Sequence, residues 1–159
     1  MSDKRPILLA TDGSPSAADA QAKAIELAQL LDVTLLAVSV AHVSLPAVGY
    51  SGYGYSNVVA ELTGAEHERV EKLLADVTET AEAAGVRCSS YVGEGIAADE
   101  ICRIAAEREA QMIVVGSHGW NAARRLFSGS VSTALVHQAP CPVLVVRSPR
   151  RAAEHKAAA

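Results

Sequence analysis

Short, almost uninterrupted apolar runs alternate along this chain with segments that repeat apolar residues at helical spacing. The runs cover residues 6–11, 33–40, 112–115 and 142–146, and a more mixed segment at 86–92 completes the set. Apolar runs without polar alternation are typical of strands buried on both faces, as in a parallel sheet covered by helices. The sequence therefore predicts five parallel strands, with residues 86–92 a candidate for an edge of the sheet.

The segments between the runs predict four helices. Ser14-Pro15 has the pattern of an N-cap followed by proline at the first helical position. One face of this helix would bury Ala17, Ala20, Ala24, Leu27, Ala28 and Leu31. Further helices are expected over 61–84, where Gly85 would provide a left-handed C-cap, over 97–109, and over Ser130–Gln138. Five strands alternating with four helices predict an α/β domain with right-handed crossovers.

One long connection and one tail fall outside this alternation. Residues 42–59 form a connection longer than most loops, and its segment 49–55 holds three of the four tyrosines. We expect a lid, an interface loop or a plain insertion there. With 159 residues, half of them hydrophobic, the chain fits one domain over residues 1–147. The polar, alanine-rich residues 148–159 are expected to be a disordered tail.

Composition argues against two classes of protein. The formal charge is 14 − 18 = −4 and the pI is near 5.7, so we expect no nucleic-acid partner, because phosphate binding needs a basic face. No apolar run approaches the ~20 residues that span a bilayer, and the N-terminus does not read as a signal peptide, so no membrane span is expected. The three cysteines, Cys88, Cys102 and Cys141, are widely spaced, which is typical of reduced thiols in a cytoplasmic protein.

The segment that follows the fourth run contains the strongest candidate for a binding site. In parallel α/β sheets, ligands bind beyond the carboxyl ends of the strands. Gly116 and Gly119 would allow a tight turn with close approach to a ligand, and Gly129-Ser130 would open a helix whose N–H groups favour an anion. The segment is therefore either a phosphate cradle, with hydroxyl donors from Ser130 and Ser132, or a plain connection that Ser130 caps. The residues alone support both equally.

Other nucleotide and hydrolase patterns fit less well. Residues 93–98 match the dinucleotide pattern G-x-G-x-x-A, but they follow the third strand, and no acidic residue lies about 20 positions later. No Gly-Lys-Ser/Thr occurs, so a P-loop is excluded, and no G-x-S-x-G elbow is present. These patterns therefore favour neither a dinucleotide-dependent enzyme, nor a P-loop ATPase, nor a serine hydrolase.

From about residue 6 to residue 147, the chain resembles the universal stress protein family. Three stretches carry the resemblance: residues 7–14, 116–132 and 139–146. The ATP-binding branch of that family is marked by Gly, two residues, Gly, nine residues, Gly, then Ser or Thr. Gly116, Gly119, Gly129 and Ser130 have this spacing.

The resemblance implies a fold and a set of site residues. The fold would be a Rossmann-like open sheet of five parallel strands in the order 3-2-1-4-5, with four helices on both faces. Thr11, Asp12 and Gly13 would lie against the nucleoside, and Val40 would present its backbone to adenine. The phosphates would be held by Gly116, Ser117, His118, Gly119, Gly129, Ser130, Val131 and Ser132. Asp12 would coordinate a phosphate-bound Mg²⁺ or bond a ribose hydroxyl, or else only start the turn before Ser14.

The function implied by the resemblance is that of a nucleotide-dependent sensor or regulator in the stress response. ATP would be the main ligand, with AMP or ADP weaker, and hydrolysis slow or absent, so the protein is not expected to be an enzyme. Two alternatives stay open: a slow ATPase, and an interaction protein whose glycine loops are vestigial. No residue pattern identifies a downstream protein partner.

The last apolar run predicts a homodimer. In the order 3-2-1-4-5, residues 142–146 form an edge strand, and an exposed apolar edge invites pairing. Pairing with the same strand of a second copy would give a two-fold interface, the commonest symmetry of oligomers. Members of the family that the chain resembles commonly dimerise in this way. The alternative is a monomer whose edge is protected by Pro140 and Pro142.

Overall fold

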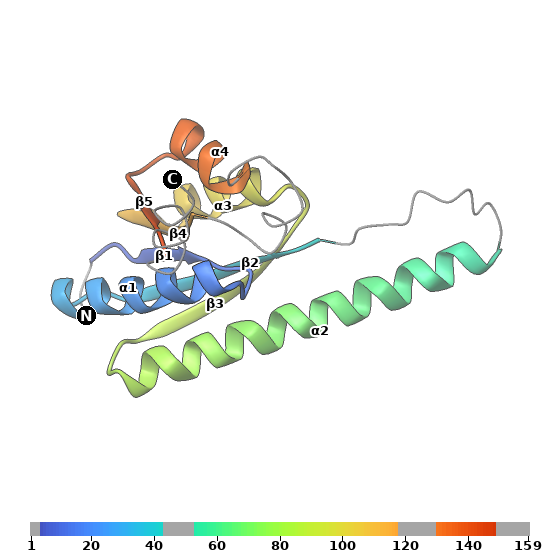
Figure 1. Ribbon diagram of the computed structural model, residues 1–159, viewed down its shortest axis with the longest axis horizontal. Helices are drawn as coiled ribbons and strands as arrows, with labels where there is room; N and C mark the ends of the chain where they lie inside the picture. Colours follow the sequence, from blue (N-terminus) through green and yellow to red (C-terminus); the bar gives the residue numbers. More distant parts are fainter. Residues whose placement is uncertain (1–3, 43–52, 118–129, 149–159) are drawn as a thin grey trace, which may run out of the picture.

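The computed structural model describes residues 4–42, 53–117 and 130–148. Five strands form one parallel sheet in the order β3-β2-β1-β4-β5 (Figure 1). The strands are β1 (Ile7–Ala10), β2 (Leu35–Ala41), β3 (Cys88–Glu94), β4 (Met112–Gly116) and β5 (Val143–Val146), and all four neighbouring pairs are parallel. The strand order, the parallel pairing and the edge position of the third strand confirm the fold predicted above.

Two helices cover each face of the sheet, so that two cores form. The helices are α1 (Pro15–Leu31), α2 (Tyr53–Ala83), α3 (Ala97–Glu107) and α4 (Ser130–Gln138). On one face, Ile7 and Leu9 of β1 pack with α1 and α2. On the other face, Leu8 and Ala10 pack with α3 and α4. All four residues of β1 are buried, which explains why that run shows no polar alternation.

Several predicted boundaries are wrong. Helix α2 begins at Tyr53 rather than at residue 61, so residues 53–59 of the predicted connection 42–59 are helical. The first turns of α2 extend past the sheet (Figure 1), where Val58 and Leu62 are exposed, so no buried face marks them in the sequence. Strands β2 and β3 each begin two residues later than predicted, and α3 ends at Glu107 rather than at residue 109.

The face predicted for α1 is confirmed except at its end. Its N-cap is Ser14, whose Oγ accepts a hydrogen bond from the Ala17 N–H at 3.2 Å, and Pro15 is the first helical residue. Four alanines of the predicted face are buried, namely Ala17, Ala20, Ala24 and Ala28. Leu31 is instead 44% exposed, because α1 ends there at the left-handed residue Asp32. Among the described helices, none is long and apolar enough to cross a membrane.

The C-terminus of α2 depends on a glycine. Gly85 has φ +80°, and the Val86 N–H donates to the Ala81 carbonyl at 2.9 Å. This left-handed residue ends the helix as the sequence predicts. Gly64 lies inside the same helix, and a Cβ added at either glycine would meet nothing within 4 Å.

We predict that Gly85→Ala and Gly64→Ala change stability in opposite directions. Gly85→Ala should lower the free energy of unfolding by about 1 kcal/mol, because an L side chain is strained in the left-handed region. Gly64→Ala should raise it by about 0.5–1 kcal/mol, because alanine favours the helix. Urea unfolding of both variants beside wild type measures this. A Gly85→Ala variant as stable as wild type would contradict the assigned helix end.

Candidate functional site

The carboxyl ends of β1 and β4 lie side by side in the middle of the sheet. Ala10 and Val115 are partners in the register, so the turn after β1 is adjacent to Gly116 at the end of β4. The first turn of α1 packs directly on this point, since a Cβ on Gly116 would lie 2.7 Å from the Ser16 carbonyl oxygen. Position 116 must therefore be glycine, because α1 packs too close to it to leave room for a side chain.

Hydrogen bonds fix the turn between β1 and α1. The Ser14 N–H donates to Asp12 Oδ1 at 2.9 Å, and the Gly13 N–H donates to Thr11 Oγ1 at 3.2 Å. Asp12 thus has the turn-forming role that the sequence left open. One of its carboxylate oxygens serves the turn, and the carboxylate as a whole is held next to the N-terminus of α1, where a negative charge is stabilised.

Every buried polar residue in the described part of the chain carries a hydroxyl group, and four of the five lie where a helix begins or just before it. Thr11 and Ser14 precede α1, Ser16 is in its first turn, and Ser132 is in the first turn of α4. Ser39 lies near the end of β2. In the same turn of α4, Val131 packs against the core that includes Ala10 and Val115. The N-terminus of α1 therefore lies at the carboxyl ends of β1 and β4. Helix α4 connects the parallel strands β4 and β5, so its N-terminus is on the same, carboxyl side of the sheet, and helix N-termini attract anions.

Val40 lies near the end of β2, where its register partner is Gly93 of β3. A Cβ on Gly93 would lie 3.1 Å from Val40 Cγ2 and 2.7 Å from Glu100 Cγ. The space over Gly93 is thus taken by side chains of the protein itself. Strand β3 is also an edge strand, so the pattern at residues 93–98 lacks the central position that a dinucleotide site needs.

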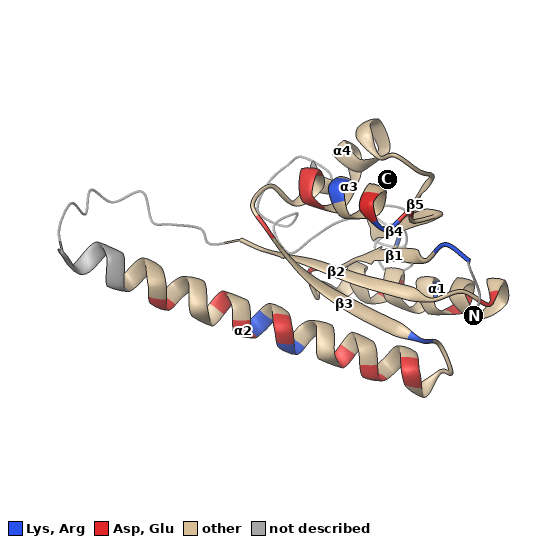
Figure 2. Ribbon diagram, turned by 180° about the vertical axis from the view of Figure 1, so that it is seen from behind, with Lys and Arg blue, Asp and Glu red and all other residues tan. Residues whose placement is uncertain are grey.

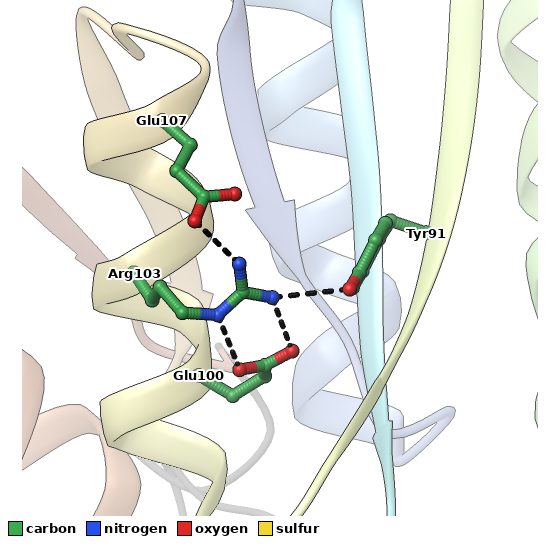
Figure 3. A network of polar contacts seen from close by, with 4 residues as sticks. All are labelled: Tyr91, Glu100, Arg103 and Glu107. Carbon is green, nitrogen blue, oxygen red and sulfur yellow. Dashed lines mark hydrogen bonds and ion pairs between the residues drawn. The ribbon is translucent and has the colours of Figure 1, made fainter.

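An ion-pair network holds the Glu100 side chain next to Gly93 (Figure 3). Arg103 Nε and Nη2 donate to the Glu100 carboxylate at 2.8 and 2.7 Å, and Arg103 also donates to Glu107 and to the Tyr91 hydroxyl. The hydrogen bonds from Arg103 hold the pKa of Glu100 below its usual value. This network ties α3 to β3 on the face of the sheet opposite α2.

Sequence reasoning missed a second charged group, on α2. Arg69 Nε and Nη2 both donate to the Glu66 carboxylate at 2.8 Å. These bonds lower the pKa of Glu66 and raise that of Arg69. One residue away, His67 Nε2 lies 3.8 Å from Glu94 Oε1 at the end of β3. The sequence did contain a sign of this pair, since Glu66 and Arg69 are spaced three residues apart next to the apolar Val70. The helical pattern, however, predicts only which apolar residues are buried.

The predicted site residues divide into two groups. The structure places Thr11, Asp12, Gly13, Val40, Gly116, Ser117, Val131 and Ser132 at the carboxyl ends of β1, β2 and β4 or in the first turn of α4. Ser130 begins α4, whereas His118, Gly119 and Gly129 lie outside the described residues, as do residues 43–52 and 149–159. Within the described ranges, no group of three or more His, Cys, Asp or Glu is arranged to hold a metal ion.

The thiols lie away from these turns. Cys88, Cys102 and Cys141 are free and half-buried. Burial raises the pKa of each thiol, which lowers the fraction of reactive thiolate near pH 7. The prediction of reduced thiols that pack as small apolar groups fits this arrangement.

Comparison with known proteins gives relatives for nearly the whole chain. The model of the universal stress protein family matches residues 4–147. A universal stress protein of Methanocaldococcus jannaschii is 34% identical over 147 residues, which are 92% of this chain and 84% of the relative. The solved structure of the universal stress protein UspA from Lactobacillus plantarum has a TM-score of 0.79 and 26% identity, over 92% of this chain and all of the other.

Two further structures share the fold and contain nucleotides. One is the universal stress protein of Archaeoglobus fulgidus in complex with dAMP, with a TM-score of 0.64 and 21% identity over 90% of this chain and 98% of the other. The second is a family member from Arabidopsis thaliana with AMP bound, with a TM-score of 0.65 and 20% identity over 93% and 95% of the two chains. The sheet order, the turns at the ends of β1 and β4 and the match over residues 4–147 lead to one conclusion: this chain belongs to the universal stress protein family.

Proposed function

We propose that this protein binds an adenine nucleotide, ATP in the first place, at the carboxyl ends of β1 and β4, and that it acts as a nucleotide-dependent regulator in the stress response. One observation carries the proposal: the N-terminus of α1 lies at the adjacent ends of β1 and β4, α4 begins on the same side of the sheet, and the buried polar residues at these helix starts carry hydroxyl groups. Such a site offers hydrogen-bond donors and positive dipole ends to phosphates. The AMP and dAMP complexes of proteins with this fold support the choice of an adenine nucleotide.

The donor set fits phosphates better than it fits a metal ion. Thr11, Ser16 and Ser132 carry hydroxyl groups, and Asp12 contributes a carboxylate at the same edge. A Mg²⁺ ion would therefore come with the phosphates and take Asp12 as its protein ligand, since Mg²⁺ is commonly bound through one or two carboxylates together with substrate phosphates. On this proposal, the nucleoside lies toward β2 and the backbone of Val40.

We predict that wild-type protein binds ATP with Mg²⁺ present and binds ADP and AMP more weakly. Gly129→Val should weaken ATP binding at least tenfold, because a side chain there would block the approach of phosphate to the backbone. Val136→Ala, at an exposed position of α4 beyond its first turn, is the control and should leave the affinity unchanged. Isothermal titration calorimetry measures all three. Wild-type protein that binds no adenine nucleotide would favour the alternative, an interaction protein with vestigial glycine loops.

We propose that bound ATP is hydrolysed slowly or not at all. No P-loop lysine and no nucleophile elbow occur in the sequence, and Asp12 is already engaged by the Ser14 N–H.

We predict turnover far below ~1 s⁻¹, the lower end of typical enzymes. Phosphate release by wild type, by Asp12→Ala and by the control Asp76→Ala, an exposed carboxylate on α2, tests this. Turnover at enzyme-like rates that only Asp12→Ala abolishes would identify an ATPase with Asp12 in its catalytic site.

We also propose that two copies pair through β5. This strand is an edge of the sheet, and its four apolar residues are only half-buried. The Pro142 carbonyl accepts a hydrogen bond from the N–H of Ile113 in β4, and the Val146 carbonyl accepts one from the N–H of Ser117, just after β4. Alternate residues of a parallel strand bond to opposite sides, so the N–H groups of Val143 and Val145 point away from β4.

We predict a dimer at tens of micromolar wild-type protein. Val145→Pro should yield a monomer, because it removes an outward N–H and leaves the bonds to β4 in place; proline is tolerated on the outer side of an edge strand. Gln138→Ala, at the exposed end of α4, is the control. Sedimentation equilibrium decides: wild type that is monomeric with and without ATP, or a Val145→Pro variant that is still dimeric, would contradict pairing through β5.

A further inference from the structure

The Glu66–Arg69 pair lies next to the Asp12 turn. Leu73 of α2 contacts this turn, since a Cβ on Gly13 would lie 3.2 Å from Leu73 Cδ1. Helix α2 connects the parallel strands β2 and β3, so it runs antiparallel to them, and its earlier residues lie further beyond their carboxyl ends. Arg69 precedes Leu73 by four residues and is thus about one helical turn, roughly 5.4 Å, above Gly13 on the same side of α2.

We propose that Arg69, held by Glu66, is a positioning residue that orients the Asp12 carboxylate toward the nucleoside half of the bound nucleotide. The inference rests on the proposed function, since it assigns a new residue to that same site. Arg69 and Lys72 are the only Lys or Arg residues of α2, and they lie together in the middle of the helix (Figure 2).

Electrostatics supports a link between Arg69 and Asp12. The charge of Asp12 contributes to the raised pKa of Arg69, together with the larger effect of Glu66. Opposite charges attract, so the Arg69 guanidinium on α2 draws the Asp12 carboxylate toward α2. The Ser14 N–H holds Asp12 Oδ1 from the side of α1.

Two observations argue against Arg69 as a phosphate ligand. Its Nε and Nη2 groups already donate to Glu66. Helix α2 packs on β2 and β3, whereas α1 packs on β4 and α4 packs on β5. The proposed phosphate site at the N-termini of α1 and α4 is therefore on the β4 side of Asp12, and Arg69 is on the β2 side.

The chain offers a matched control on the opposite face of the sheet. Arg103 also donates through Nε and Nη2 to a glutamate three residues earlier, at 2.8 and 2.7 Å, and its side chain is about as exposed as that of Arg69 (Figure 3). Its partners are Glu100, Glu107 and Tyr91, away from Asp12. Arg69→Gln and Arg103→Gln thus remove the same kind of ion pair from two different surroundings.

The test compares ATP, ADP, AMP and adenosine as ligands of wild type and of Arg69→Gln, Arg69→Lys and Arg103→Gln. Calorimetry gives affinity and stoichiometry, and thermal unfolding checks that each variant is folded. Arg69→Gln should lower the affinity for all four ligands by the same factor, about five to ten, because the lost interaction acts on the nucleoside that all four share. Arg69→Lys should recover most of the affinity, since it keeps the charge, and Arg103→Gln should bind like wild type.

Three results would overturn the proposal. A loss that grows from AMP to ATP and spares adenosine would make Arg69 a phosphate ligand. Equal affinities of Arg69→Gln and wild type would show that Arg69 does not act on the site. Wild type that binds none of the four ligands would reject the proposed function itself and this inference with it, so the two failures are distinguishable by the behaviour of wild type.

Discussion

The close packing of α1 on the end of β4 is the constraint on which the site depends. Strand β1 is central and buried on both faces, so the chain must leave the sheet at its carboxyl end and turn at once into α1. The first turn of this helix then lies against Gly116, where the Ser16 carbonyl leaves no room for a Cβ. This contact holds the Asp12 turn and the end of β4 together. The carboxyl edge of these two adjacent strands therefore has helix N-termini and hydroxyl groups beside it, and these are the groups that suit an anion.

Glycine at position 116 is consequently needed for the packing of α1, whether or not a ligand binds there. A side chain there would push α1 away and separate Asp12 from β4, so loss of binding in a variant at this position would not by itself identify a ligand contact. The turn on the other side of Asp12 is fixed from α2, through Leu73 over Gly13. The Asp12 turn is thus held between two helices that belong to different parts of the sequence.

The sequence predicted the sheet well because burial determines its pattern. Strands buried on both faces read as apolar runs, and Ser14-Pro15 and Gly85 mark helix ends through local backbone chemistry that needs no tertiary information. The start of α2 was not predictable in this way, because apolar residues in its early turns, Val58 and Leu62, are exposed and so form no buried face with a helical period. The Glu66–Arg69 pair was missed for a related reason. The role of polar side chains on a helix can be inferred only when the fold shows which loop lies next to them. For Glu66 and Arg69 this is the turn at Gly13.

A crystal structure of the protein grown with saturating ATP and Mg²⁺ tests the central claim most directly. The claim predicts electron density for one nucleotide at the carboxyl ends of β1 and β4. Its phosphates should lie at the N-termini of α1 and α4, and its nucleoside should lie against Asp12 on the side of β2 and α2. A nucleotide bound elsewhere on the chain, or density at this edge reversed so that the phosphates lie under α2, would contradict the claim.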